Sequence, residues 1–171
     1  MRIILASSSP RRIELLRQIV PKFEDIPSKF DEKTIQDVET NPKELVEKLS
    51  FLKAEEVFRQ LEKTEEEVVV IGGDTIVYFE GEFLGKPKNE EDAFCMLNKI
   101  QGKENEVYTG LAVIGKNGKE VHSSKTIVTM KKMTEEDIKE YIATKEPLDK
   151  AGSYAVQGIR SKIYRKNRRK L

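Results

Sequence analysis

The sequence predicts an α/β protein of mixed α+β character, with a mixed twisted sheet and flanking helices in two small lobes around a central cleft. Three observations support this fold class. Short strands rich in β-branched residues alternate with amphipathic helices, Asn117-Gly118 marks a β-hairpin, and both crossovers and hairpins are needed to join the elements. Such connections require a mixed sheet. We expect a single domain over residues 1–171, atypical or truncated after about residue 158.

The N-terminal part of the chain supplies a strand and two helices. The run Arg2–Ala6 predicts a short buried strand, and Ser9 with Pro10 suits the cap and first position of a helix. Asn41 with Pro42 opens a longer helix in the same way. Apolar residues recur with helical spacing in both segments: Ile13, Leu16 and Val20 in the first, and Leu45, Leu49, Leu52, Val57 and Leu61 in the second.

The central run VVVIGGDTIVYF predicts two strand segments, Val68–Ile71 and Thr75–Phe79, separated by two glycines and Asp74. A turn at Glu80-Gly81 leads into EFLGKP. Later helices begin at Asn89 and at Thr134, because an aspartate follows each of these caps three residues on.

The remaining elements are a hairpin and a short segment near the end. The hairpin occupies NEVYTGLAVIGKNGKEVHSSKTIVTM. Gly152 and Gly158 bracket a strand-like SYAVQ segment.

The composition limits the kinds of functional site that the chain can contain. Lys and Arg number 31 against 30 Asp and Glu, so the net charge of +1 provides no general field for nucleic acid, and an anion site must be a local cluster. A single cysteine leaves no partner for a disulfide, and one cysteine with one histidine cannot supply the ligands of a zinc site of the usual kind. The chain has no apolar run long enough for a signal peptide or a membrane span. We expect a cytoplasmic protein.

The junction LASSSPRR combines hydroxyls, arginines and a helix start. The backbone N–H groups and the dipole of a helix N-terminus favour an anion, and the guanidinium groups of Arg11 and Arg12 match phosphate oxygens. The pattern therefore predicts a phosphate site that includes Ser9. The alternative is an ordinary capped helix with two solvated arginines. The glycine spacing of a P-loop is missing.

Further charged candidates lie elsewhere in the chain. Lys53 falls on an otherwise apolar helix row, and Lys86 lies in the tight turn LGKP; each also suits an ordinary surface lysine. Asp74 emerges at a strand end, where it is either catalytic or part of a local turn. Asp31 and Glu32 share one loop and are either solvated or ligands of a cation, since Mg²⁺ prefers oxygen ligands.

The motifs SSSPRR, GGDT, LGKP, YTG and EPLDKAGSYAVQG, in this order and spacing, resemble the Maf family of nucleoside triphosphate pyrophosphatases, once described as septum-formation inhibitors. The resemblance runs from the N-terminus to about Gly158. Within this family, the sequence is similar to the branch that acts on dTTP and UTP. That branch carries an arginine, a threonine and a glutamine at the positions of Arg11, Thr75 and Gln157. The branch that acts on 7-methyl-GTP has a glutamine after the aspartate instead.

The resemblance implies a mechanism and a set of partners. Asp74 is expected to accept a proton from the water that attacks the α-phosphorus. A divalent cation, Mg²⁺ or Mn²⁺, is expected at Glu32 and Asp74. The residues expected to bind the nucleoside triphosphate are Ser9, Arg11, Arg12, Lys53, Thr75, Lys86 and Gln157. The family also allows a homodimer, while neither a membrane nor a nucleic-acid partner is expected.

The end of the chain departs from the family pattern, because IRSKIYRKNRRKL replaces a strand pair and a helix. One interpretation is a solvated basic tail, and another is a patch that contacts phosphates or nucleic acid. A third is a frameshift in the genome, the clone or the recorded sequence. If AT-rich codons are assumed from Lys162 onward, skipping one base restores an alternating strand like that of the family.

Two other functions compete with the pyrophosphatase. The chain could be a nucleotide-binding regulator of cell division that does not hydrolyse its ligand, or a nucleic-acid-binding protein that uses the basic end. The presence of Asp74, Lys53 and Lys86 favours the enzyme, and a nucleic-acid role predicts binding that weakens with salt.

Overall fold

The computed structural model describes residues 1–32, 41–61, 67–155 and 164–170. It divides into two compact units. The first unit comprises Met1–Asp74 and Thr109–Ser123, and the second comprises Thr75–Tyr108 and Ser124–Leu171. Three long strands belong in part to each unit, namely β3 (Val68–Phe79), β5 (Glu104–Gly115) and β6 (Gly118–Met130).

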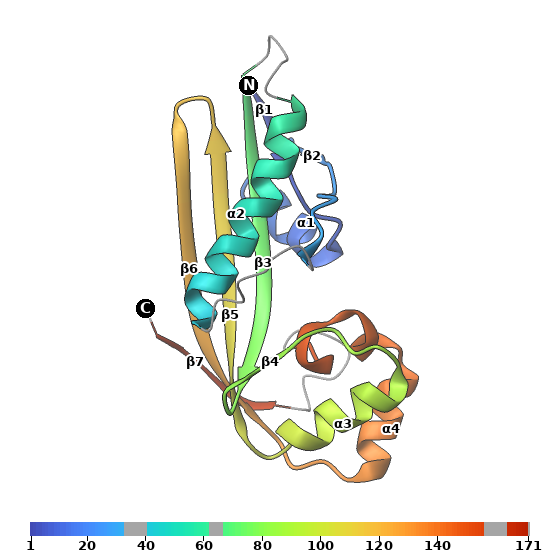
Figure 1. Cartoon of the computed structure of the whole chain (residues 1–171). Coiled ribbons are helices and arrows are strands. Elements are labelled where there is room, and N and C mark those ends of the chain that lie inside the picture. Colours follow the sequence, from blue (N-terminus) through green and yellow to red (C-terminus); the bar gives the residue numbers. More distant parts are fainter. Residues whose placement is uncertain (33–40, 62–66, 156–163, 171) are drawn as a thin grey trace. The chain divides into compact units, whose positions relative to one another are not determined.

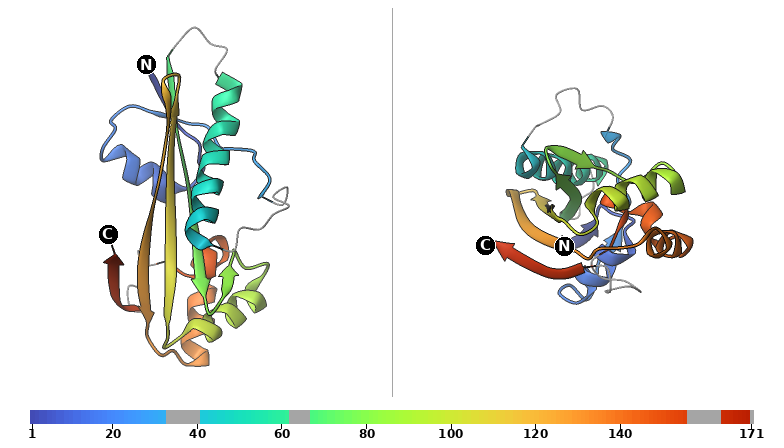
Figure 2. Two further views of the ribbon diagram at one scale, coloured as in Figure 1. Left: turned by 60° about the vertical axis from the view of Figure 1, so that its left-hand side comes forward. Right: turned by 90° about the horizontal axis from the view of Figure 1, so that it is seen from below.

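The described strands form one mixed sheet in the order β2-β1-β3-β5-β6-β7, with β4 (Glu82–Leu84) paired to β3 (Figures 1 and 2). β1 (Arg2–Leu5) is parallel to both β2 (Glu24–Asp25) and β3, and β4 is antiparallel to β3. The predicted mixed α/β fold is therefore confirmed, as is the hairpin between β5 and β6 at Asn117-Gly118. The predicted break at the two glycines is absent, because β3 continues through them.

The first unit is built around α2 (Pro42–Leu61) and the strands that it covers, as Figure 1 shows. Asn41 caps this helix as predicted, since its side chain accepts the N–H of Lys43 at 3.0 Å. The shorter helix α1 (Pro10–Arg17) has no fully buried residue, and its predicted stripe is at most half-buried. The core of this unit consists of buried aliphatic side chains: Ile4, Ala6, Ala54, Val57, Val68, Val70, Ala112 and Ile114.

Two glycines let α2 approach the sheet closely. A Cβ at Gly72 would lie 2.4 Å from the carbonyl oxygen of Ser50 and 2.7 Å from the Cβ of Ala54. At Gly110 it would lie 2.4 Å from the Ser50 hydroxyl oxygen. These distances are shorter than contacts between real atoms, so any side chain at either position would force the helix away from β3 and β5. The backbone and side chains of α2 fill the space that Gly72 leaves.

The second unit packs α3 (Glu90–Ile100) against α4 (Glu135–Ala143), followed by the short helices η2 (Glu146–Asp149) and η3 (Ala151–Ser153). Asn89 and Thr134 cap the two α-helices as predicted. The strand-like interpretation of SYAVQ is wrong at its start, because Ser153 belongs to η3 and Gly152 has a positive φ of 68°. The part from Val156 lies outside the described residues. No described helix is long and apolar enough to cross a bilayer.

The basic end forms a strand. β7 (Tyr164–Lys170) pairs antiparallel with β6, with Thr126 opposite Arg169. The interpretation as a solvated tail therefore does not hold for this backbone, because its peptide groups pair with β6. The frameshift hypothesis stays a prediction that the nucleotide sequence can test.

Replacing Gly72 with alanine tests the close approach of α2. We expect Gly72→Ala to lower the free energy of unfolding by about 1–3 kcal/mol, because the new methyl group must displace helix backbone. Gly85→Ala is the control, since a Cβ there meets nothing within 4 Å, and it should change stability by less than about 0.5 kcal/mol. Chemical denaturation measures both values. Equal stability of the two variants would contradict the packing.

Candidate active site

Ser7 organises the turn between β1 and α1. Its hydroxyl oxygen accepts the N–H of Ser9 at 3.2 Å and a guanidinium N–H of Arg12 at 3.3 Å. Ser9 occupies the N-cap position as predicted, but its side chain makes no capping hydrogen bond. Ser7 is buried, so the helix start and Arg12 are held by the serine two residues ahead of the cap.

Asp74 lies at the centre of a charged cluster. Its Oδ1 lies 2.9 Å from the Nζ of Lys53 and 3.9 Å from the Nη2 of Arg12. The same Nζ lies 2.7 Å from Oε1 of Glu32. Only 8% of Asp74 is exposed. The structure thus brings together four residues that the sequence predicts for the site, from α1, α2, β3 and the loop before α2.

Burial and neighbouring charges shift the pKa values of Arg12 and Lys53 in opposite directions. Burial lowers the pKa of the Arg12 guanidinium, against the attraction of Asp74 and Glu32. Burial would also lower the pKa of Lys53, but its ion pairs and hydrogen bonds with Asp74 and Glu32 outweigh that effect and raise it. Lys53 therefore stays charged throughout the neutral range, although it is largely surrounded by protein.

Among the other predicted site residues, Arg11 belongs to the first unit, whereas Thr75 and Lys86 belong to the second. Arg11 is exposed, and its guanidinium contacts Glu14 on the same helix at 3.0 Å. Thr75 follows Asp74 in β3 but belongs to the second unit, as does Lys86, which is exposed in the turn after β4. Gln157 lies outside the described residues. Asp31 is exposed beside Glu32.

The acidic oxygens at the cluster fit a divalent cation in part. Glu32 and Asp74 each place one carboxylate oxygen within hydrogen-bonding distance of the same ammonium. Hard oxygen ligands of this kind suit Mg²⁺, which keeps several waters or phosphate oxygens in its shell. Within the described ranges, no group of three or more acidic, histidine or cysteine side chains could hold a metal. Waters and phosphate oxygens could complete the shell of such an ion.

The sequence motifs left two contributions unexplained. Ser7 belongs to the same serine run as Ser9. The sequence pattern favoured Ser9 as a site residue because it precedes Pro10. Gly110 belongs to the motif YTG, and only the structure shows that its missing Cβ makes room for α2. Both act on the site through packing and hydrogen bonds.

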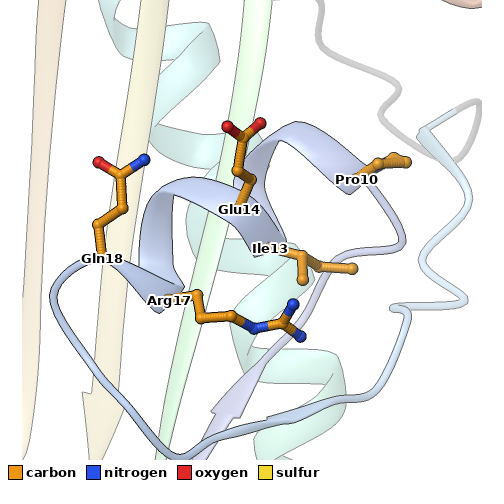
Figure 3. A pocket seen from close by; sticks show the side chains of 5 residues that line it. All are labelled: Pro10, Ile13, Glu14, Arg17 and Gln18. Atoms are coloured by element: carbon orange, nitrogen blue, oxygen red, sulfur yellow. The ribbon is translucent and has the colours of Figure 1, made fainter.

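A separate pocket of about 520 Å³ lies on α1, as Figure 3 shows. Pro10, Ile13, Glu14, Arg17 and Gln18 line it. None of the four cluster residues contributes to this lining. The pocket lining and the charged cluster are therefore separate sets of residues.

The fold and the cluster define a class: a mixed α/β protein with a buried carboxylate between two cations beside a helix N-terminus, suited to a phosphate-bearing ligand. The chain belongs to the Maf family, since the family model described as Maf-like protein matches residues 2–167. The resemblance seen in the sequence is thereby confirmed. Membership of this family agrees with a general requirement for a divalent cation and does not specify which one.

Curated relatives cover most of the chain. A protein named dTTP/UTP pyrophosphatase from Caldicellulosiruptor saccharolyticus is 47% identical over 167 residues, which cover 96% of this chain and 83% of that protein. A protein of the same name from Caldicellulosiruptor bescii is 50% identical, covering 95% and 81%. A crystal structure of the nucleoside-triphosphatase / dITP/XTP pyrophosphatase from Mycobacterium abscessus has a TM-score of 0.46 and 12% identity, covering 78% and 76% of the two chains.

Replacing Lys53 with methionine tests the cluster. We expect Lys53→Met to lower the free energy of unfolding by about 1–3 kcal/mol at pH 7, because the carboxylate of Asp74 stays largely buried without its closest cation. A lysine with a raised pKa stabilises the fold fully below its ordinary pKa. The difference from the unmodified chain should therefore persist to about pH 10 and shrink only above it.

Lys48→Met is the matched control, since Lys48 lies exposed on the same helix. Denaturant unfolding at several pH values measures both variants. If Lys48→Met costs as much as Lys53→Met, the ion pair does not stabilise the cluster.

Proposed function

We propose that this chain is a nucleoside triphosphate pyrophosphatase that hydrolyses dTTP and UTP to the monophosphate and pyrophosphate. One observation carries the proposal: Asp74, the residue expected to accept the proton, is buried and held by Lys53 at 2.9 Å within a cluster at the start of α1. The names of the curated relatives support the choice of substrates. The activity belongs to the cytoplasm, where these nucleotides are used.

The proposed reaction assigns each cluster residue a task. Asp74 accepts one proton of the attacking water as the water oxygen bonds to the α-phosphorus, and the bond from that phosphorus to the bridging oxygen breaks to release pyrophosphate. Arg12 and the N–H groups at the start of α1 bind phosphate oxygens. Lys53 holds the carboxylate of Asp74 in place and offsets negative charge in the transition state.

We propose a divalent cation at Glu32 and Asp74, with Mg²⁺ and Mn²⁺ as the candidates. When bound, such an ion polarises the phosphoryl oxygens. Glu32 and Asp74 are the residues that would hold it.

The first experiment is hydrolysis of dTTP, UTP, CTP, 7-methyl-GTP and ATP with Mg²⁺, Mn²⁺ or excess EDTA. We expect pyrophosphate release from dTTP and UTP, loss of turnover in EDTA, and a drop of about 10²–10⁴-fold in Asp74→Asn, because a general base is lost. Asp25→Asn, an exposed change in β2 of the first unit, should leave the rate unchanged.

The products separate the competing functions. Release of diphosphate and phosphate would contradict the assigned bond cleavage. Nucleotide binding without turnover in the unmodified chain would favour the non-hydrolysing regulator, and binding of neither dTTP nor UTP would contradict the proposal altogether.

We further propose that Arg11, Thr75 and Gln157 select the base. Because the branch acting on 7-methyl-GTP carries glutamine after the aspartate, Thr75→Gln should lower kcat/KM for dTTP relative to 7-methyl-GTP by about 10-fold. Thr109→Gln, an exposed threonine in β5, is the control for a bulkier side chain. An unchanged ratio in Thr75→Gln would remove Thr75 from base selection.

A further inference from the structure

A carboxylate on α2 that belongs to none of the predicted motifs contacts the loop of Glu32. Glu56 lies three residues after Lys53, so the two side chains project from adjoining turns on one face of the helix. The loop that carries Glu32 crosses this face.

Glu56 binds the loop through hydrogen bonds from neutral groups. Its Oε2 accepts the hydroxyl of Ser28 at 2.9 Å and the backbone N–H of Lys29 at 2.9 Å. Its Oε1 accepts the side-chain amide of Gln60. No salt bridge to Glu56 occurs within the described part of the chain. Both oxygens of the carboxylate are thus used to hold neutral donors.

Ser28 extends this contact into the loop. Its hydroxyl oxygen also accepts the backbone N–H of Phe30 at 3.1 Å, which closes a serine turn. Two residues after Phe30, Glu32 reaches Lys53 at 2.7 Å. The loop therefore has two anchors on one helix, at Glu56 and at Lys53.

The Lys53 anchor restrains only the side chain of Glu32. The Glu32 side chain is 55% exposed, and exposed ion pairs hold their partners weakly. A carboxylate that accepts two hydrogen bonds from consecutive loop residues restrains both a side chain and the backbone. Glu56 is accordingly the anchor that restrains the backbone of the loop.

We propose that Glu56 is a positioning residue, which fixes the loop Ser28–Glu32 on α2 so that Glu32 stays beside Lys53 and Asp74. The catalytic consequence rests on the proposed function, in which Glu32 is a cation ligand. Residues that orient metal ligands typically change metal affinity or activity by about 10–100-fold when they are removed.

The kinetic test compares Glu56→Ala with Glu55→Ala. Glu55 lies on the same helix and pairs with Arg59 at 3.1 Å, so its replacement removes the same charge without touching the loop. For dTTP hydrolysis, we expect Glu56→Ala to raise the Mn²⁺ concentration for half-maximal rate about 10-fold, with kcat at saturating Mn²⁺ within about 2-fold. Glu56→Gln keeps an acceptor oxygen and should show a smaller rise, while Glu55→Ala should show none.

A double-mutant cycle asks whether Glu56 acts through Glu32. In a Glu32→Gln background, adding Glu56→Ala should have no further effect on the Mn²⁺ requirement, because coupled residues are not additive. An equal, additive effect in both backgrounds would overturn the proposal, as would a loss of kcat with an unchanged Mn²⁺ requirement.

Hydrogen exchange provides a readout that needs no activity. In Glu56→Ala, the amides of Lys29 and Phe30 should exchange at least about 10-fold faster, while amides of β3 stay protected. If the chain hydrolyses no nucleotide, the proposed function fails, yet this measurement still decides the anchor. Unchanged exchange at Lys29 and Phe30 would overturn it.

Discussion

The close approach of α2 to the sheet is the constraint on which the first unit depends. Gly72 on β3 and Gly110 on β5 both face the turn of α2 that contains Ser50, and neither position has room for a Cβ. Lys53 follows Ser50 by three residues, and Asp74 follows Gly72 by two. The same contact that closes the core therefore sets the 2.9 Å distance between the ammonium and the carboxylate. A helix even slightly further away would separate them.

Two kinds of polar contact connect α2 with its surroundings: ion pairs, and hydrogen bonds from neutral donors. On one turn of α2, Lys53 forms ion pairs with the carboxylates of Glu32 and Asp74. On the next turn, Glu56 accepts hydrogen bonds from neutral donors of the loop Ser28–Glu32. The buried pair depends on close geometry because desolvated charges are costly, whereas the loop contacts tolerate exposure. Together they hold three segments distant in sequence, namely α2, the loop Ser28–Glu32 and β3, around one carboxylate.

Sequence patterns predicted the mixed sheet, the helix caps and the hairpin, since these depend on local residues and short spacings. They also predicted that Asp74, Lys53 and Arg12 take part in one site, through the family motifs. They predicted a break in the strand at Gly72, whereas β3 continues through it and α2 fills the space beside it. Glu56 escaped notice for a related reason: nothing local distinguishes it from Glu55, and its partners lie 27 and 28 positions away.

The charges of the cluster bear on how a nucleotide could bind. Arg12 and Lys53 already face Asp74 and Glu32, so the formal charges of these four side chains cancel. A triphosphate brings a large negative charge, and the two cations cannot offset it while they still stabilise both carboxylates. Binding must therefore bring in further positive charge or release one carboxylate from its ammonium. A cation that arrives with the nucleotide would do both, because it binds phosphate and carboxylate oxygens together. On this argument the affinities for cation and nucleotide are coupled, each raising the other.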